Sequence, residues 1–183
     1  MLNKKQKEIL LNIARKTIAC FLAGQKLELP KITDPALIEK RGVFVTLRKD
    51  GELRGCIGII IPEKPLVDAV KTMAIEAAIR DPRFTPVNLG ELKEIEIEIS
   101  VLTAPKKISS PDDIVLGRDG VIVRKGNYMG VFLPQVAEET GWTKEEFLSA
   151  LCAHKAGIEP DAWKKPDTEL FTFQAEVFSE NNL

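Results

Sequence analysis

The sequence predicts an α+β domain, and three observations lead to that prediction. Residues 4–23 place apolar side chains near one helical face and lysines on the other. Residues 94–101 read EIEIEISV and alternate polar with apolar residues, as a half-exposed antiparallel strand does. Residues 43–61 and 120–133 each hold two apolar runs separated by a turn, which is the pattern of a β-hairpin. The chain has 183 residues, of which 44% are hydrophobic, so it can form one sizeable domain or two small lobes.

The first third of the chain predicts a helix followed by a hairpin. The helix over residues 4–23 meets a C-terminal stop at Gly24. A loop containing Pro30 and Pro35 follows. The first strand covers residues 43–47, and the returning strand covers residues 52–61. Because Asp-Gly between two apolar runs is a strong hairpin signal, the turn is expected at Lys49-Asp50-Gly51.

The middle of the chain predicts a helix and then the alternating strand. Pro65 suits the first turn of a helix, where its missing N–H costs nothing, and Asp81-Pro82 ends that helix. In the strand over residues 94–101, the isoleucines are expected to face the core and the glutamates to face water.

The last third predicts a second hairpin, two helices and a strand. The hairpin over residues 120–133 follows a polar loop, and Pro134 opens the next helix. A further helix over residues 143–156 starts with the capping-box pattern of Thr143 and Glu146. One continuous strand is expected over residues 170–178.

Part of the first hairpin is echoed in the second. Residues 42–45 (GVFV) match residues 120–123 (GVIV) at an offset of 78, and residues 55–57 (GCI) align with residues 130–132 (GVF) at an offset of 75. Each hairpin is followed by a helix that begins with proline. The echo indicates two related strand–strand–helix units, but so short a match also arises by chance. If the units are related, Val131 occupies the place of Cys56.

Composition excludes several function classes. The chain has 26 basic and 27 acidic residues and a net charge of −1, so nothing draws it to nucleic acid or to an anionic membrane. No apolar run approaches the roughly 20 residues that a membrane helix needs. The N-terminus resembles no secretory signal. Three widely spaced cysteines match neither a disulfide framework nor a zinc pattern, so we expect free thiols in the cytoplasm.

The segment Leu53–Gly58 (LRGCIG) is the main candidate site. Gly55 and Gly58 flank the thiol of Cys56 and would let a ligand approach the backbone. Arg54 would share a strand face with Cys56, favour its thiolate and attract an anion. A second interpretation makes Cys56 a small buried hydrophobic residue whose glycines relieve crowding. Covalent catalysis would also need a base, and no histidine lies nearby in the sequence.

Three further residues are candidates for ligand binding. Asp81 could orient Arg83, which would grip a carboxylate or phosphate at the rim of the site. The same two residues could instead tie down a loop while Phe84 fills the core. Gln135, at a helix start after the second hairpin, could add a neutral donor near an anion or serve only as a cap. The single histidine, His154, is expected at the surface.

We expect no metal site. Glu94, Glu96 and Glu98 fall on one face of a strand, where spaced carboxylates usually serve solubility. No cluster with metal-ligand spacing accompanies them, and the chain has no phosphate-loop or dinucleotide fingerprint.

Several segments, in this order, resemble the AMMECR domain family, named after a human chromosomal region linked to Alport syndrome, mental retardation, midface hypoplasia and elliptocytosis. The segments are Leu53–Gly58 (LRGCIG), Asp81–Val87 (DPRFTPV), Glu98–Leu102 (EISVL), Phe132–Val136 (FLPQV) and Gly141-Trp142. The resemblance covers nearly the whole chain and is to the archaeal and bacterial members.

The resemblance implies a single α+β domain over residues 1–183, with a barrel-like antiparallel sheet built from two repeats, at about 42–80 and 120–157. The family has no established biochemical activity, and its functional motif corresponds here to Leu53–Gly58. In some prokaryotes the domain is fused to, or encoded beside, a Memo-type domain and a radical S-adenosylmethionine protein.

Two functional hypotheses follow. The first is a small-molecule site, enzymatic or not, formed by Arg54, Gly55, Cys56 and Gly58 and bordered by Arg83. In it Cys56 would contact or attack an electrophilic centre as the candidate catalytic residue, and Arg54 would bind the charge of an anionic ligand. The second is an interaction module that acts with Memo-like or radical S-adenosylmethionine proteins. The residues name neither a substrate nor a cofactor, and they leave both an enzyme and a binding protein open.

Overall fold

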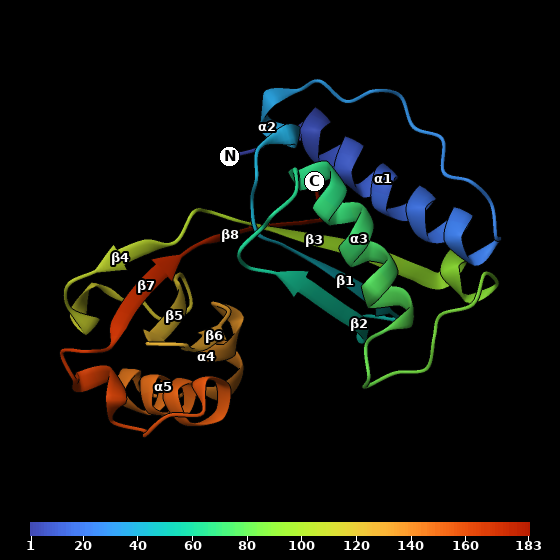
Figure 1. Ribbon diagram of the computed structural model, residues 1–183. Coiled ribbons are helices and arrows are strands. Elements are labelled where there is room, and N and C mark those ends of the chain that lie inside the picture. The colour runs from blue at the N-terminus through green and yellow to red at the C-terminus, as the bar shows by residue number, and fades with distance from the viewer. The chain divides into compact units, whose positions relative to one another are not determined.

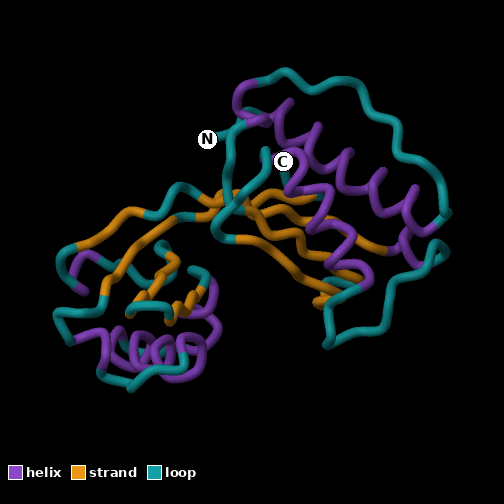
Figure 2. The backbone as a smooth tube through the Cα atoms, viewed as in Figure 1, coloured by secondary structure: helices purple, strands orange, loops and turns teal.

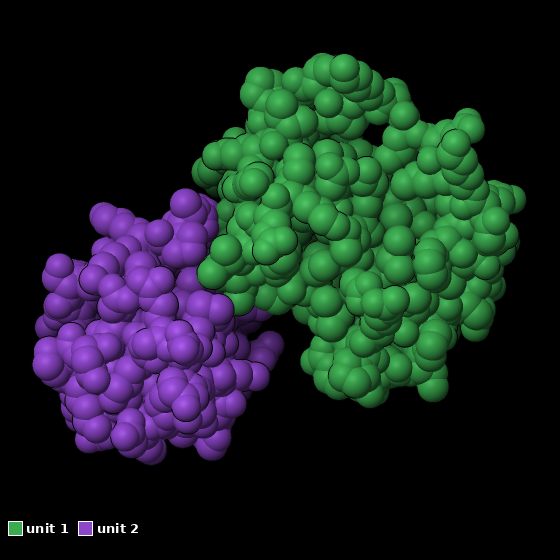
Figure 3. Space-filling view, in the orientation of Figure 1, with its two compact units in different colours: residues 1–102, 176–183 green, residues 103–175 purple.

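The computed structural model describes residues 1–183 and confirms the α+β class, with helices and two antiparallel four-stranded sheets (Figure 1). The chain divides into two compact units (Figure 3). Unit 1 comprises residues 1–102 and 176–183, and unit 2 comprises residues 103–175. Figure 2 shows the strands gathered into two groups. No helix is both long enough and apolar enough to cross a membrane.

Unit 1 contains a sheet with the strand order β2-β1-β3-β8. Strand β1 lies inside the sheet and pairs antiparallel with both β2 and β3. The elements of unit 1 are α1 (Lys4–Leu22), α2 (Pro35–Ile38), β1 (Val43–Lys49), β2 (Glu52–Ile59), α3 (Leu66–Ile79), the 3-10 turn η1 (Glu91–Glu94), β3 (Ile95–Leu102) and β8 (Ala175–Ser179).

Helices α1 and α3 form the layer that covers one face of this sheet (Figure 1). Helix α1 begins with a capping box, in which Asn3 and Gln6 each accept a hydrogen bond from the other's backbone N–H. In β1, Val43, Val45 and Leu47 are fully buried against the helices. This period of two places the intervening residues of β1 on the opposite face of the sheet.

The β1–β2 hairpin turns where the sequence predicts. Asp50 has φ 52° and Gly51 has φ 82°, the two left-handed conformations that a tight hairpin turn requires. The register then shifts, because Arg48 pairs with Leu53 but Leu47 pairs with Gly55. Arg54 therefore has no partner in β1 and forms a β-bulge.

Unit 2 contains a second sheet, with the order β4-β7-β5-β6, and a core that includes the fully buried Phe147, Leu148 and Leu151. Its elements are β4 (Lys106–Ile108), η2 (Pro111–Asp113), β5 (Gly120–Lys125), β6 (Tyr128–Phe132), α4 (Gln135–Thr140), α5 (Lys144–Ala150), η3 (Leu151–Ala156), η4 (Ala162–Lys164) and β7 (Glu169–Phe173). The predicted helix over residues 143–156 is α5 continued by η3, a π-helical turn that ends at the left-handed Gly157.

The predicted continuous strand over residues 170–178 is wrong. Residues 170–178 instead belong to two strands, β7 in the sheet of unit 2 and β8 in the sheet of unit 1, with the exposed Gln174 between them. The buried residues Leu170, Phe173 and Phe178 do not keep a period of two, so one straight strand could not bury all three on one face.

The barrel-like arrangement is not confirmed. Each sheet has a free strand at both ends of its strand order, so neither sheet closes on itself. The assignment of residues 1–183 to one domain stays a prediction.

The two units share the pattern that the sequence echo indicates. In each, a hairpin is followed by helix, and the first hairpin strand also pairs with a later strand, as β1 does with β3 and β5 with β7. Gly55 and Gly130, which the echo aligns, both lie against helix backbone. A Cβ on Gly55 would be 2.3 Å from the Ala77 carbonyl oxygen, and one on Gly130 would be 2.6 Å from the Ala156 nitrogen.

We predict that Gly55→Ala and Gly130→Ala each lower the free energy of unfolding by about 1–3 kcal/mol, because backbone must move to admit the new methyl group. The measurement is urea unfolding followed by circular dichroism. Gly90→Ala is the control, since its φ of −66° suits alanine and the nearest obstacle is the flexible Asn88 side chain at 3.3 Å. Stability equal to that of the control would contradict close strand–helix packing at the two glycines.

Candidate functional site

The candidate site lies on edge strand β2 and on the sheet face opposite the helices. Cys56 pairs with Thr46 in β1, and Thr46 pairs with Glu98 in β3. These three side chains therefore form an in-register row across β2, β1 and β3, which we call the polar row. Gly55, which is one residue from Cys56, faces the helices instead.

Cys56 is half-buried, and its sulfur accepts a hydrogen bond of 3.2 Å from the Thr46 hydroxyl. Burial raises the pKa of the Cys56 thiol above its ordinary value, although the Thr46 hydrogen bond and the charge of Arg83 act in the opposite direction. The thiol is therefore mainly protonated at neutral pH, which suits a ligand contact better than a nucleophile.

Arg54 forms an ion pair with Glu91 rather than an interaction with the Cys56 thiol. Its Nε lies 2.7 Å from Glu91 Oε1 and its Nη2 lies 3.1 Å from Oε2, and both side chains are largely buried. The Arg54 hydrogen bonds lower the pKa of Glu91. Because the bulge at Arg54 interrupts strand alternation, the expectation that Arg54 activates Cys56 gains no support from this geometry.

Asp81 and Arg83 close the free edge of β2 at Cys56. Asp81 Oδ2 accepts the Cys56 amide N–H at 2.8 Å, and Arg83 Nη2 donates to the Cys56 carbonyl at 3.3 Å. Arg83 also donates from Nε to Asp81 Oδ1 at 2.9 Å and from Nη2 to Oδ2 at 2.7 Å. The pair thus takes the hydrogen-bonding place of a neighbouring strand at this residue.

The Asp81 side chain is 2% exposed, whereas that of Arg83 is 54% exposed. The Arg83 guanidinium holds the pKa of the Asp81 carboxyl far below its usual range, and the Cys56 and Arg83 amides add to the effect. Asp81 is therefore ionised across the physiological range. The pair therefore ties down the loop and also borders Cys56, whereas the binding of a carboxylate or phosphate by Arg83 stays a prediction.

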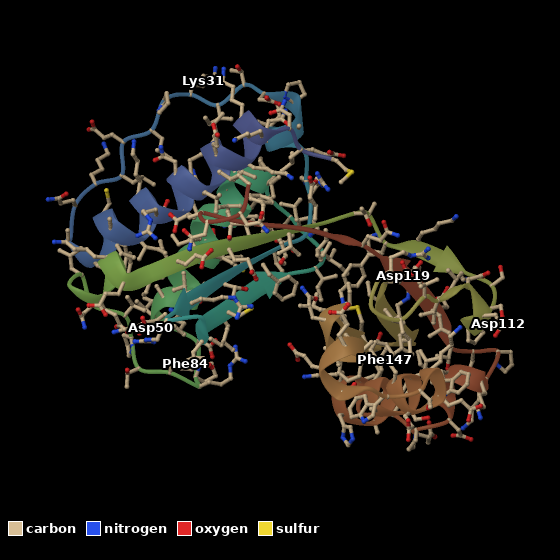
Figure 4. The ribbon with its side chains drawn as sticks, turned by 180° about the vertical axis from the view of Figure 1, so that it is seen from behind. Lys31, Asp50, Phe84, Asp112, Asp119 and Phe147 are labelled. Atoms are coloured by element: carbon tan, nitrogen blue, oxygen red, sulfur yellow. The ribbon has the colours of Figure 1, made fainter.

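Phe84 lies between the two arginines rather than in the core. Its ring centre is 6.0 Å from the Arg54 guanidinium carbon and 5.5 Å from that of Arg83, within cation–π range. Figure 4 labels Phe84 in the loop that follows α3. The loop thus brings one half-buried aromatic ring and the ion-paired Arg83 to the edge of the sheet, where Arg54 of β2 lies on the other side of the ring.

The motif glycines serve packing between parts of the protein. A Cβ on Gly58 would lie 2.2 Å from the ring of Phe44, its partner across the strands, and Gly55 admits the Ala77 carbonyl as described above. The sequence suggests that these glycines leave the backbone open to a ligand. In the structure, the space on the side-chain face of each glycine is filled by another part of the protein.

The remaining candidates belong to unit 2. Gln135 is the first residue of the six-residue helix α4, and its buried Oε1 has no hydrogen-bond partner. His154 is exposed on η3, as expected. The structure therefore brings Arg54, Gly55, Cys56, Gly58, Asp81 and Arg83 together in unit 1 and places Gln135 elsewhere in the chain.

Sequence reasoning missed three residues of the site, namely Thr46, Glu91 and Glu98. Counting back from the Asp50-Gly51 turn sets Thr46 opposite Gly55, and only the bulge moves it opposite Cys56. The glutamates of β3 were expected in water, but β3 lies inside the sheet and Glu98 is half-buried, with its Oε2 3.6 Å from Arg48 Nε.

Glu94 is exposed and pairs with Lys49 at 2.7 Å. The structure contains no group of three or more histidine, cysteine, aspartate or glutamate side chains that could hold a metal ion.

Comparison with known proteins establishes the family. The AMMECR1 family model matches residues 11–178, and the chain belongs to this family. A protein of Thermococcus gammatolerans is 48% identical over 94% of this chain and 89% of its own length. Protein MK0488 of Methanopyrus kandleri is 50% identical over 98% of this chain and 90% of its own length.

The same fold is present in the crystal structure of uncharacterized protein PH0010 from Pyrococcus horikoshii. That structure has a TM-score of 0.84 and 47% identity, and the match covers 96% of this chain and 91% of that one. None of these names states an activity, so the chain is a member of a family whose function is unknown.

We predict that Asp81→Asn lowers the free energy of unfolding by about 2 kcal/mol at pH 7, because hydrogen bonds to a buried charge are lost. The folded pKa lies below the value of about 3.9 expected in the unfolded chain, so the ionised carboxyl stabilises the fold above that pH. The stabilisation is lost as the pH falls through the folded pKa.

The measurement is urea unfolding of the wild type and Asp81→Asn between pH 7 and pH 2. The difference should shrink below about pH 4, whereas the partly exposed Asp68→Asn should show little difference at any pH. A difference that is constant with pH would contradict a role for the charge of Asp81.

We predict that iodoacetamide alkylates Cys56 with a pH midpoint above the value of about 8.5 typical of a free thiol. Peptide mapping by mass spectrometry, with a short unstructured cysteine peptide as the reference, reads out the rate. Thr46→Val should raise the midpoint further, because it removes the hydrogen bond to sulfur. A midpoint below that of the reference would establish an activated thiolate, and complete protection would rule out contact with a ligand.

Proposed function

We propose that the chain is a small-molecule-binding domain whose site is the polar row of Cys56, Thr46 and Glu98. The single observation that carries the proposal is the register of β2, β1 and β3, which aligns a thiol, a hydroxyl and a carboxylate on one face. Side chains on adjacent strands of a sheet are held rigidly, which suits recognition of a ligand in one orientation.

The dimensions of the row suit a small ligand. Neighbouring strands lie about 4.8 Å apart, so a row across three strands spans roughly 10 Å. Glu98 would accept hydrogen bonds from the ligand, and the Cys56 thiol would make a weak polar contact at the other end. Since the pKa of the thiol is raised, the site favours binding over attack by a cysteine nucleophile.

The ligand would also carry an anionic group. Arg83 is half-exposed beside Cys56, and its Nη1 has no hydrogen-bond partner, whereas Nε and Nη2 are held by Asp81. A carboxylate or phosphate on the ligand could therefore reach Arg83 while polar groups meet the row. The proposal therefore assigns the expected anion to Arg83 rather than to Arg54.

A thermal-shift screen with metabolites and S-adenosylmethionine-derived compounds tests the proposal. A ligand raises the melting temperature because it binds the folded form. A compound that stabilises the wild type should lose its effect on Cys56→Ala and on Glu98→Gln. It should retain its effect on Glu94→Gln, because that glutamate is exposed and outside the row. A compound that stabilises all four proteins equally would place the ligand elsewhere.

A second function, as an interaction module, is favoured by the open edge of β2 at Gly58. Both backbone groups of Cys56 point away from β1, since they bond Asp81 and Arg83. In an antiparallel pair this direction recurs at every second residue, so the N–H and C=O of Gly58 also point to the free edge. An extended segment of a partner could add to the sheet there.

An apolar hollow of about 200 Å³ lies beside this part of β2. Most of its lining is apolar, although two charged residues also border it; the lining residues are Ile59, Pro62, Glu63, Lys64, Ala69, Thr72 and Met73. A partner strand that pairs with Gly58 would direct its next side chain toward the helix-covered face, where the hollow could take one aliphatic group. The partners expected from the family resemblance are Memo-like and radical S-adenosylmethionine proteins.

The interaction function is tested by titrating the chain with a Memo-like protein encoded in the same genome. Met73→Lys should weaken binding at least about tenfold, because a charge would occupy the apolar hollow. Leu89→Lys is the control, since Leu89 is an exposed apolar residue outside the hollow. Equal affinity of the two variants and the wild type would contradict docking at this edge.

A further inference from the structure

A second candidate site lies in unit 2, in a polar hollow of about 580 Å³ beside the edge strand β4. Its lining includes two lysines and an arginine as well as several neutral polar groups. These residues are Thr103, Lys106, Lys107, Ser109, Arg118 and Gln174. None of them belongs to the LRGCIG segment, so the hollow is independent of the site proposed above.

A buried carboxylate forms the floor of the hollow. Asp119 is 3% exposed, and its Oδ2 accepts the Val115 amide at 2.9 Å, while its Oδ1 accepts Gln174 Nε2 at 3.3 Å. Arg118 donates to it twice, from Nε to Oδ1 at 2.9 Å and from Nη2 to Oδ2 at 2.7 Å. The Arg118 hydrogen bonds lower the pKa of Asp119, so the carboxylate is charged and both of its oxygens are occupied. Figure 4 labels Asp119 in this unit.

The carboxylate orients Arg118 without using all of its donors. The Arg118 side chain is 56% exposed, and its Nη1 makes no hydrogen bond or ion pair within the chain. Because Asp119 holds the Nε and Nη2 side of the guanidinium, the remaining N–H groups are presented in a fixed direction at the wall of the hollow.

Lys106 supplies a second positive charge to the hollow. It is exposed on β4, lines the hollow and forms no ion pair, whereas the ammonium of Lys107 is 2.7 Å from Glu169. Asp113 also lines the hollow, with Oδ2 accepting the Ser110 amide at 3.4 Å. Asp119 is paired with Arg118 and Lys107 with Glu169, and Asp113 forms no ion pair with Lys106.

Two hydrogen bonds between Thr103 and Gln174 hold another part of the lining. Thr103 donates its amide to the Gln174 carbonyl at 2.8 Å, and Gln174 donates its amide to Thr103 Oγ1 at 2.9 Å. Thr103 and Gln174 lie where the chain enters and leaves unit 2. The hollow is therefore bounded by a strand, a hydrogen-bonded pair of segments and a buried ion pair, all of which exist before a ligand arrives.

We propose that this hollow binds a phosphorylated small molecule, with the phosphate between Arg118 Nη1 and the Lys106 ammonium. A phosphate dianion suits one oriented guanidinium and one mobile ammonium better than a monoanion does, because it offers three acceptor oxygens and two charges. The volume falls within the range of small-molecule pockets, so the organic part of the ligand has room beside Thr103 and Ser109.

Isothermal titration calorimetry of the full chain with glycerol 3-phosphate, inorganic phosphate and uncharged glycerol tests the proposal. We expect glycerol 3-phosphate to bind more tightly than inorganic phosphate, and glycerol not to bind. Lys106→Gln and Arg118→Gln should each weaken binding of glycerol 3-phosphate at least about tenfold. Lys155→Gln, which makes the same change of charge at an exposed position of unit 2 outside the hollow, should leave binding unchanged.

Each other result overturns the proposal. No binding by the wild type at millimolar concentration removes the site, and equal losses in Lys106→Gln and Lys155→Gln would show only attraction to net charge. Equal affinity for inorganic phosphate and glycerol 3-phosphate would show that the organic part makes no contact. If Arg118→Gln fails to fold, Lys106→Gln decides the outcome, because Lys106 is exposed on an edge strand. Loss of glycerol 3-phosphate binding in Cys56→Ala, with binding retained in Lys106→Gln, would assign the ligand to the polar row and overturn this proposal.

Discussion

The candidate site of unit 1 depends on one buried carboxylate, that of Asp81. It lies just after the C-terminal end of α3, and it accepts hydrogen bonds from the Cys56 amide in β2 and from the backbone and side chain of Arg83. A buried charge is costly unless it is paired, and here every bond that pays this cost also positions part of the site. The helix end, the loop and the edge strand are consequently held together by one group.

The same device occurs in unit 2, where Asp119 is buried and holds Arg118. In both units an aspartate and a nearby arginine form a two-pronged ion pair whose carboxylate is hidden and whose guanidinium is half-exposed. The surroundings differ. Arg83 borders a thiol at the edge of a sheet, whereas Arg118 borders a polar hollow that also contains an unpaired lysine. The same kind of aspartate–arginine ion pair therefore borders a different surface in each unit.

The charges near Cys56 are largely balanced within the protein. Arg54 is paired with Glu91 and Arg83 with Asp81, so the proposed recognition of a ligand would depend on the direction of hydrogen bonds as well as on the remaining donors of Arg83. The protonated thiol fits this description, because burial outweighs the influence of Thr46 and Arg83 on its pKa. In the proposed binding role, such a site would distinguish ligands by shape and by donor pattern.

The sequence by itself determined the local structure. The alternation of EIEIEISV, the Asp50-Gly51 turn and the helical periodicity of residues 4–23 each depend on neighbours a few positions apart. The turn and the helix appear as predicted, and EIEIEISV forms β3 with its isoleucines buried, although Glu98 is half-buried rather than in water. The LRGCIG motif and its companion at Asp81–Val87 contain residues that do lie together, since Asp81 and Arg83 hydrogen-bond the backbone of Cys56. Whether they bind a ligand stays a prediction.

Only the tertiary structure decided which groups meet. The bulge at Arg54 shifts the register by one residue, which sets Thr46 opposite Cys56 and frees Arg54 to bind Glu91, 37 positions away. The division of residues 170–178 between two sheets was decided by pairing with β5 and β3, strands distant in sequence. Register and ion-pair choice depend on contacts between distant segments, and these are settled when the sheets assemble rather than by any local pattern.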